Sequence, residues 1–210
     1  MPQAEEFLYF TDPMCSWCYG FAPVMRQMVK KYGHRFALRI VAGGLRPHET
    51  RPMGNTAPSL VKHWDKVIEL TGRTFDKTFF QKYPGFVYNT GFGCRAVTAV
   101  NRMDPKRTLD FLEDMQDRFY AKGEDPTALA TFRAAATAVG LDADTFERVY
   151  GEPETEVILK AGYEEFQQLG GMGFPMLLVY LDGRYKQLTI GWQPFERVAG
   201  TLEKLLGSGT

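Results

Sequence analysis

Apolar residues form short runs near the two ends of the chain and follow a helical period between them. Residues 5–12 (EEFLYFTD) and residues 36–41 predict strands. Between these runs, apolar residues recur at three- and four-residue spacing up to Gly33, which predicts a helix. That stripe consists of Phe21, Val24, Met25, Met28, Val29 and Tyr32. The order strand, helix, strand indicates a parallel β-α-β unit.

The middle of the chain has a different character, because strand signals nearly vanish between about Pro47 and Gly171. One helical stripe lies before Gly72. The dipeptides Asp104-Pro105 and Asp125-Pro126 each predict a helix start, an N-cap followed by proline at the first helical position. A further helix is predicted over residues 157–169. We interpret residues 48–170 as a helical insertion domain.

Strand signals return near the C-terminus. The segment PMLLVYL, the pair Asp182-Gly183 and the segment RYKQLTIG predict a β-hairpin, and residues 193–206 predict an amphipathic last helix. Residues 1–47 and 171–210 are therefore predicted to form one discontinuous α/β domain around the insertion.

Charge and composition exclude several classes of protein. The 210 residues contain 25 Lys plus Arg and 25 Asp plus Glu, so the formal net charge is zero. That balance argues against nucleic-acid and anionic-membrane partners, and no run of 18 apolar residues predicts a membrane span. The first residues carry neither a basic segment nor a long apolar segment, so no signal peptide is expected. Three cysteines are too few for a disulfide framework. A cytoplasmic location is the simplest expectation.

The chemistry of the chain is concentrated in residues 12–20 (DPMCSWCYG), which hold Cys15 and Cys18. A strand, a turn and C-x-x-C at the start of a helix are typical of thioredoxin-like redox proteins. Free backbone N–H groups and the helix dipole favour a thiolate at Cys15, and the thiolate is the species that attacks a disulfide. Cys18, one turn further, is expected to be less exposed and to resolve the mixed disulfide.

Two other interpretations of the cysteine pair remain open. A structural zinc ion requires four ligands, and the other candidates, Cys94, His34, His48 and His63, form no second close pair. The pair could also be inert core cysteines, although its place at the end of a strand favours partial exposure, as reactive cysteines require. We therefore expect no metal and no organic cofactor.

A proline near the other end of the chain supports redox chemistry. Pro175 begins the predicted strand in GFPMLLVY. Proline normally avoids strand interiors, so one explanation is a trans proline that opens an edge strand. With C-x-x-C present, we instead expect a cis Phe174-Pro175 bond that faces the two sulfurs.

Together these segments resemble the DsbA family of thioredoxin-fold proteins, and more closely its FrnE-like branch, whose members are predicted protein-disulfide isomerases. The likeness covers nearly the whole chain and includes CSWCYG, AGGL after the second strand, CRAV in the insertion, GFPMLLV and GWQPF. It implies a thioredoxin-like fold (β-α-β, then β-β-α) with a large α-helical insertion.

The resemblance also implies roles for particular residues. Cys15 matches the nucleophile, Cys18 the resolving cysteine and Pro175 the cis-proline of the substrate groove, where the backbone of Phe174 would pair with an extended substrate. Ser16 and Trp17 stand where periplasmic DsbA enzymes have Pro-His, so a strongly oxidising potential is not implied. Related isomerases and kappa-class glutathione transferases have serine at the first position, and Cys15 therefore favours redox chemistry.

Other residues have weaker claims. Trp17 and Tyr19 would form an apolar lip for a substrate or pack against the insertion. Cys94 is interpreted as a buried structural cysteine, with a third redox thiol as the alternative, and His48 and His63 are expected on surfaces.

The predicted function is thiol–disulfide exchange with protein thiols and disulfides or with glutathione. The alternatives are a glutathione-dependent isomerase or transferase acting on a small molecule, and a binding module without catalysis.

Overall fold

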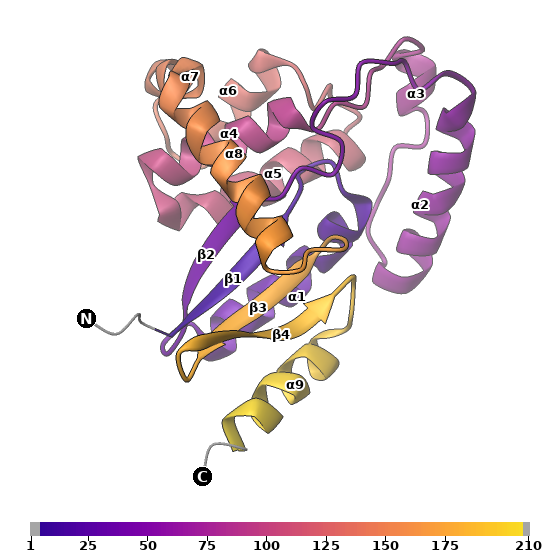
Figure 1. The fold of residues 1–210 in the computed structure, drawn as a ribbon. Coiled ribbons are helices and arrows are strands. Elements are labelled where there is room, and N and C mark those ends of the chain that lie inside the picture. Colours follow the sequence, from indigo (N-terminus) through magenta and orange to yellow (C-terminus); the bar gives the residue numbers. More distant parts are fainter. Residues whose placement is uncertain (1–4, 208–210) are drawn as a thin grey trace.

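The computed structural model describes residues 5–207. Its sheet has the strand order β2–β1–β3–β4 (Figure 1). β1 (Glu6–Thr11) is parallel to β2 (Ala37–Ala42) and antiparallel to β3 (Met176–Leu181), which is antiparallel to β4 (Arg184–Ile190). β1 is therefore an inner strand whose two neighbours come from opposite ends of the chain.

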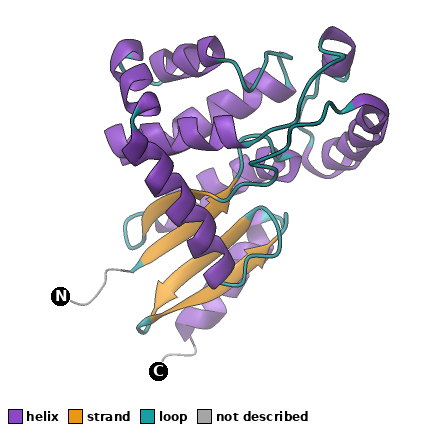
Figure 2. Ribbon diagram, turned by 45° about the horizontal axis from the view of Figure 1, so that its top comes forward, coloured by secondary structure: helices purple, strands orange, loops and turns teal. Residues whose placement is uncertain are grey.

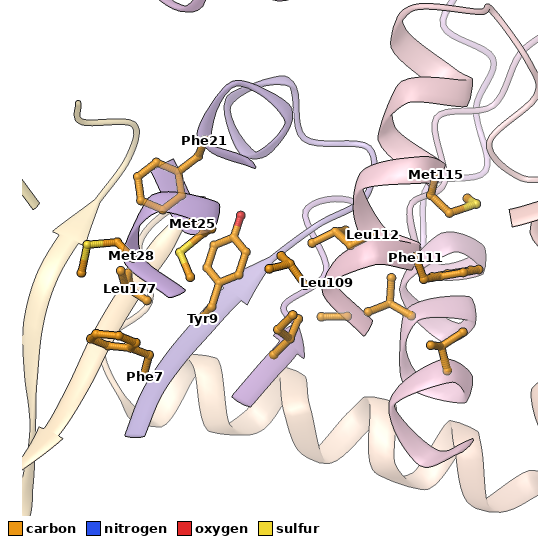
Figure 3. Packing of buried hydrophobic residues seen from close by; sticks show 14 of the residues in the cluster. Phe7, Tyr9, Phe21, Met25, Met28, Leu109, Phe111, Leu112, Met115 and Leu177 are labelled. Atoms are coloured by element: carbon orange, nitrogen blue, oxygen red, sulfur yellow. The ribbon is translucent and has the colours of Figure 1, made fainter. Parts of the chain in front are cut away.

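Helices cover both faces of β1. Phe7 and Tyr9 point towards α1 (Ser16–Tyr32), as Figure 3 shows. Leu8 and Phe10 pack on the other face with Phe166 of α8 (Pro153–Gln168). Because a strand that is covered on both faces buries every side chain, the segment FLYF is a continuous apolar run without alternation.

Most of the helices lie between β2 and β3 in the sequence, and Figure 2 shows most of these gathered beyond one end of the sheet, whereas α8 extends from this group across the face of the sheet. The helices between the two strands are η1 (Gly54–Thr56), α2 (Ala57–Thr71), α3 (Phe79–Lys82), α4 (Gly91–Met103), η2 (Pro105–Arg107), α5 (Thr108–Tyr120), α6 (Leu129–Ala138), α7 (Ala143–Gly151) and α8. The chain continues after β4 into α9 (Phe195–Gly207), which packs on α1 and β4. None of the helices in residues 5–207 has the length and apolar character needed to cross a membrane.

The main hydrophobic core extends across the predicted boundaries of the insertion. It joins Phe7 and Tyr9 of β1 to Phe111 and Leu112 of α5 (Figure 3). Val97 of α4 belongs to the same core. The division into a domain of residues 1–47 and 171–210 and a domain of residues 48–170 stays a prediction, and its ends at residues 1–4 and 208–210 lie outside the described residues.

The structure contains the predicted β-α-β unit, hairpin and last helix. The hairpin turn places Asp182 and Gly183 at φ values of 53° and 80°, the left-handed pair that a two-residue type I′ turn requires.

One predicted helix start was wrong. The carboxylate of Asp125 accepts hydrogen bonds from the N–H and hydroxyl of Thr127, and α6 begins later, at Leu129. Asp125 therefore closes a local turn and does not cap the helix. Two helices, α3 and α7, were not predicted, and α8 begins four residues before the predicted Val157.

Candidate redox site

The turn between β1 and α1 positions Cys15. Cys15 is the N-cap of α1, with an extended backbone (φ −90°, ψ 115°), and its N–H donates a 3.1 Å hydrogen bond to the carbonyl of Asp12. Its own carbonyl accepts the N–H of Tyr19 at 3.0 Å. The sulfur-bearing residue therefore stands just before the first helical residue, where the free N–H groups and the positive end of the helix dipole act on an anion.

The two cysteines of the pair differ in burial. The Cys15 residue is 5% exposed and Cys18 is wholly buried, and both are free thiols. Burial, followed by the neighbouring Cys15 sulfur, raises the pKa of the Cys18 thiol. A buried thiol that holds its proton is a poor first nucleophile, so the geometry assigns the more accessible position to Cys15, as the sequence predicted.

Pro175 lies beside the cysteine pair, as the sequence predicted. The Phe174-Pro175 peptide bond is cis, and Pro175 directly precedes β3. The Sγ atom of Cys15 is 4.0 Å from the carbonyl oxygen of Phe174, although 159 positions separate the two residues. The predicted meeting of the proline segment with the cysteine pair is confirmed.

Met14, which precedes Cys15, has both backbone polar groups fixed by buried side chains. Its N–H donates to Oδ1 of Asp12 at 2.8 Å. Its carbonyl accepts hydrogen bonds from the hydroxyls of Tyr88 and Tyr120, the second at 2.5 Å. Because buried backbone groups are costly to leave unpaired, these contacts hold the turn in one conformation.

Asp12 is a residue whose importance the sequence reasoning missed. It is wholly buried, and its Oδ2 accepts the N–H of Leu45 at 2.7 Å and the thiol of Cys94 at 3.3 Å. Burial raises the pKa of the Asp12 carboxyl. The only signal in the sequence is an aspartate between a buried strand and a proline, a pattern that predicts no more than the end of a strand.

A cavity of about 220 Å³ opens beside the cysteine pair. Its lining includes Cys15, Trp17, His63 and Phe174. Trp17 is half-buried, and its ring meets that of His63 edge-on at 5.6 Å. His63 is exposed, as expected, but it also lines the cavity, which the sequence did not indicate.

The remaining candidates do not face this cavity. Tyr19 is buried and stacks on Tyr120 of α5 at 5.0 Å, so it packs against the insertion and forms no lip. Cys94 is buried in α4, and burial raises the pKa of its thiol. His48 is exposed. Within residues 5–207 no cluster of His, Cys, Asp and Glu has the arrangement of a metal site.

The comparison with protein families identifies the fold. The model of the DSBA-like thioredoxin domain matches residues 8–203. The chain belongs to this family. Its α/β sheet with a helical insertion is thus a DsbA-like thioredoxin fold, as the resemblance implied.

Relatives of this DSBA-like chain carry several names. A putative protein disulfide isomerase from Nitrosomonas europaea is 30% identical, with a TM-score of 0.90 over 99% of this chain and 100% of that one. The cytosolic disulfide reductase DsbM from Pseudomonas aeruginosa, in a structure with glutathione, is 25% identical, with a TM-score of 0.77 over 96% and 99%. The ClpXP adapter protein SpxH of Shouchella clausii is 22% identical over 96% of this chain and 67% of its own length.

Proposed function

We propose that this DSBA-like protein is a thiol–disulfide oxidoreductase that exchanges disulfides with protein substrates through Cys15-Ser16-Trp17-Cys18. The observation that carries the proposal is the inequality of the two thiols, because Cys15 lines the cavity at the start of α1 while Cys18 is wholly buried. The names of the reductase and isomerase relatives support the same chemistry.

The reaction has two steps. The Cys15 thiolate attacks one sulfur of a substrate disulfide, a Cys15–substrate disulfide forms, and the other substrate sulfur leaves as a thiolate and takes up a proton. Cys18 then loses its proton and attacks the Cys15 sulfur, which releases the second substrate sulfur. The two electrons pass from the cysteine pair to the substrate, and the reverse sequence oxidises a dithiol.

The substrate would lie in the cavity between α1 and the segment before β3. In this proposal Trp17 supplies an apolar wall, and Phe174 and Pro175 shape the opposite side, where the Phe174 carbonyl faces Cys15. The exchange needs no metal or organic cofactor, because both electrons reside in the sulfur atoms. Protein thiols and glutathione are the partners, and the cytosolic reductase among the relatives supports a cytoplasmic location.

Substitution of each cysteine tests the proposal. Cys15→Ser should abolish reduction of insulin disulfides, whereas Cys18→Ser should accumulate a mixed disulfide through Cys15, since the resolving sulfur is missing. Cys94→Ser is the matched control and should retain reduction. Full insulin reduction by Cys15→Ser would show that the mechanism is wrong.

The trapped adducts separate the alternatives. Protein adducts on Cys18→Ser, identified by mass spectrometry from a lysate of the native host, support the oxidoreductase. Glutathione as the sole adduct, with transferase or isomerase turnover intact in Cys18→Ser, would instead favour the glutathione-dependent enzyme. Thiols that fail to react with any disulfide would favour a binding module, the kind of role that the name of the adapter relative describes.

A further inference from the structure

Arg46 is a fixed cation at the cavity beside Cys15. It follows β2 in the sequence, and its backbone is anchored in both directions to Thr90, with N–H···Oγ1 and O···H–N hydrogen bonds of 3.0 Å each. The side chain is exposed and lines the cavity. The loop position of Arg46 is therefore set by the insertion.

Its guanidinium rests on residues that also contact the cysteine turn. It lies 5.6 Å from the centre of the Tyr88 ring, and Nη1 is 3.9 Å from Sδ of Met53. The Tyr88 hydroxyl in turn donates to the carbonyl of Met14, which is bonded to Cys15. One aromatic ring thus links the guanidinium to the backbone that carries the reactive sulfur.

Apart from the reactive sulfur of Cys15, the side chains that line this cavity include basic groups but no acidic ones. The lining residues are Met14, Cys15, Ser16, Trp17, Leu45, Arg46, Leu60, His63, Tyr88 and Phe174, which include no carboxylate. Arg46 forms no ion pair with any carboxylate in residues 5–207. The first turn of α1 contains no acidic residue either, so its free N–H groups add to the positive potential.

The size and charge of the cavity indicate what it accepts. At about 220 Å³ it is smaller than the roughly 300–1,000 Å³ of typical ligand pockets, so it holds one short arm of a molecule. A guanidinium presents a planar fork of N–H donors that matches the two oxygens of a carboxylate. An arm with a sulfur and a nearby carboxylate fits both features.

We propose that Arg46 is a specificity-determining residue that selects disulfides of the glutathione type, whose thiol halves carry carboxylates. This inference rests on the proposed function, since it concerns the sulfur that Cys15 attacks. Glutathione disulfide, with two carboxylates and one ammonium group in each half at neutral pH, is the probe.

The reaction of the reduced pair with this probe is balanced. Cys15 attacks one sulfur of glutathione disulfide, so that a Cys15–glutathione disulfide forms and one glutathione leaves as a thiolate that takes up a proton. Cys18 then attacks Cys15, a second glutathione leaves, and the Cys15–Cys18 disulfide is complete. The pair loses two electrons and glutathione disulfide gains them. Arg46 binds a carboxylate during the first attack and exchanges no proton.

Stopped-flow oxidation of the reduced protein measures the selectivity. Rate constants are determined for glutathione disulfide, neutral hydroxyethyl disulfide and cationic cystamine, and each is divided by the value for dithiothreitol to remove intrinsic reactivity. The corrected rate constant for glutathione disulfide should be about ten times that for hydroxyethyl disulfide. A factor of about ten corresponds to one hydrogen bond to a charged group, at the weak end of the usual range for such bonds. Added salt should lower the ratio, because the site is exposed.

Substitutions of Arg46 test whether this residue causes the preference for glutathione disulfide. Arg46→Gln should bring the ratio close to one, and Arg46→Lys should keep part of the preference, because lysine retains the charge but not the fork. Arg197→Gln removes the same charge from an exposed position on α9 and should keep the wild-type ratio.

Two results distinguish failure of the inference from failure of the proposed function. A wild-type ratio near one, or an unchanged ratio in Arg46→Gln, would overturn the role of Arg46 while leaving the oxidoreductase in place. A reduced protein that reacts with none of the three disulfides would overturn the proposed function and this inference together. If Arg46→Gln does not fold, the wild type is tested with glutathione disulfide and cystamine at low and high salt. A preference for glutathione disulfide that weakens with salt supports the inference, and the absence of a preference overturns it.

Discussion

The thiol of Cys94 donates a 3.3 Å hydrogen bond to Oδ2 of Asp12, across 82 positions of the chain. The contact joins α4 of the insertion to the turn that carries Cys15. The same oxygen accepts the N–H of Leu45, so one buried carboxyl group connects three segments around the redox pair.

Loss of this carboxyl group should destabilise the protein. Asp12→Ala leaves the N–H groups of Met14 and Leu45 without their acceptors. A buried unpaired donor costs about 1–3 kcal/mol, and the Leu45 N–H is only partly buried and costs less. The free energy of unfolding, measured with urea, should therefore fall by about 2–4 kcal/mol. Glu69→Ala, which removes half of an exposed ion pair with Lys66, is the control and should change it by less than about 1 kcal/mol. Equal effects of the two substitutions would contradict this role of Asp12.

Asp12 should also make stability depend on pH. Burial raises its pKa in the folded protein above the ordinary value of 3.8, so the folded state holds this proton more tightly than the unfolded chain. The resulting stabilisation is fully present below the ordinary pKa and is lost as pH rises through the raised pKa. Asp12→Asn removes the titration. The unfolding free energy of the wild type minus that of Asp12→Asn should therefore decrease as the pH rises from the ordinary pKa of aspartate to the raised pKa of Asp12. An increase over this pH range would contradict the raised pKa.

The three thiols should react unequally with iodoacetamide. Cys18 and Cys94 are wholly buried, whereas Cys15 lines the cavity, and a buried group reacts only through opening of the structure. Peptide mass spectrometry of the native reduced protein should show modification at Cys15 at least about tenfold faster than at the other two. In urea the three rates should converge. Early modification of Cys18 in the native protein is the contrary result.

Gly43 should be required for the position of Phe174. A Cβ atom at Gly43 would lie 2.2 Å from Cε1 of Phe174, whose ring cannot easily retreat because it stacks on Phe166 at 4.5 Å. Gly43→Ala should therefore slow insulin reduction and lower the unfolding free energy by about 1–3 kcal/mol, as overpacking does. Gly200→Ala has open space around the added carbon and should leave reduction unchanged. Normal reduction by Gly43→Ala would show that the groove tolerates a displaced ring.

Local sequence patterns predicted much of the fold because the relevant signals lie within a few residues of one another. Asp182-Gly183 specifies its turn through backbone conformation alone. The helical stripe of α1 ends at Gly33, which is its C-cap. Asp125 misled the prediction because aspartate before proline serves a turn as well as a helix N-cap. The true start of α6 follows Ala128, which makes no side-chain cap and gives no sequence signal.

The candidate site was predictable only in its sulfur chemistry and its proline. C-x-x-C and Pro175 can be recognised from residue type and position alone. Their proximity in the folded protein could therefore be predicted. Asp12 and Arg46 owe their significance to partners that are distant in the sequence. Asp12 reaches Leu45 and Cys94 across 33 and 82 positions, and Arg46 reaches Thr90 across 44. No local period or spacing encodes such contacts.

The place of β1 between β2 and β3 has a consequence for the order in which a ribosome makes the molecule. The cysteine pair is synthesised before the insertion, whereas Phe174 and β3, which pairs with β1, follow only after the whole insertion. A nascent chain that ends before residue 174 therefore carries an unpaired strand edge and a dithiol without its Phe174 wall. Maleimide labelling of such a stalled chain should modify Cys18, which the finished protein encloses. During translation the cysteine pair is therefore made before the segment that covers it, and the two thiols are open to any cellular oxidant in that interval.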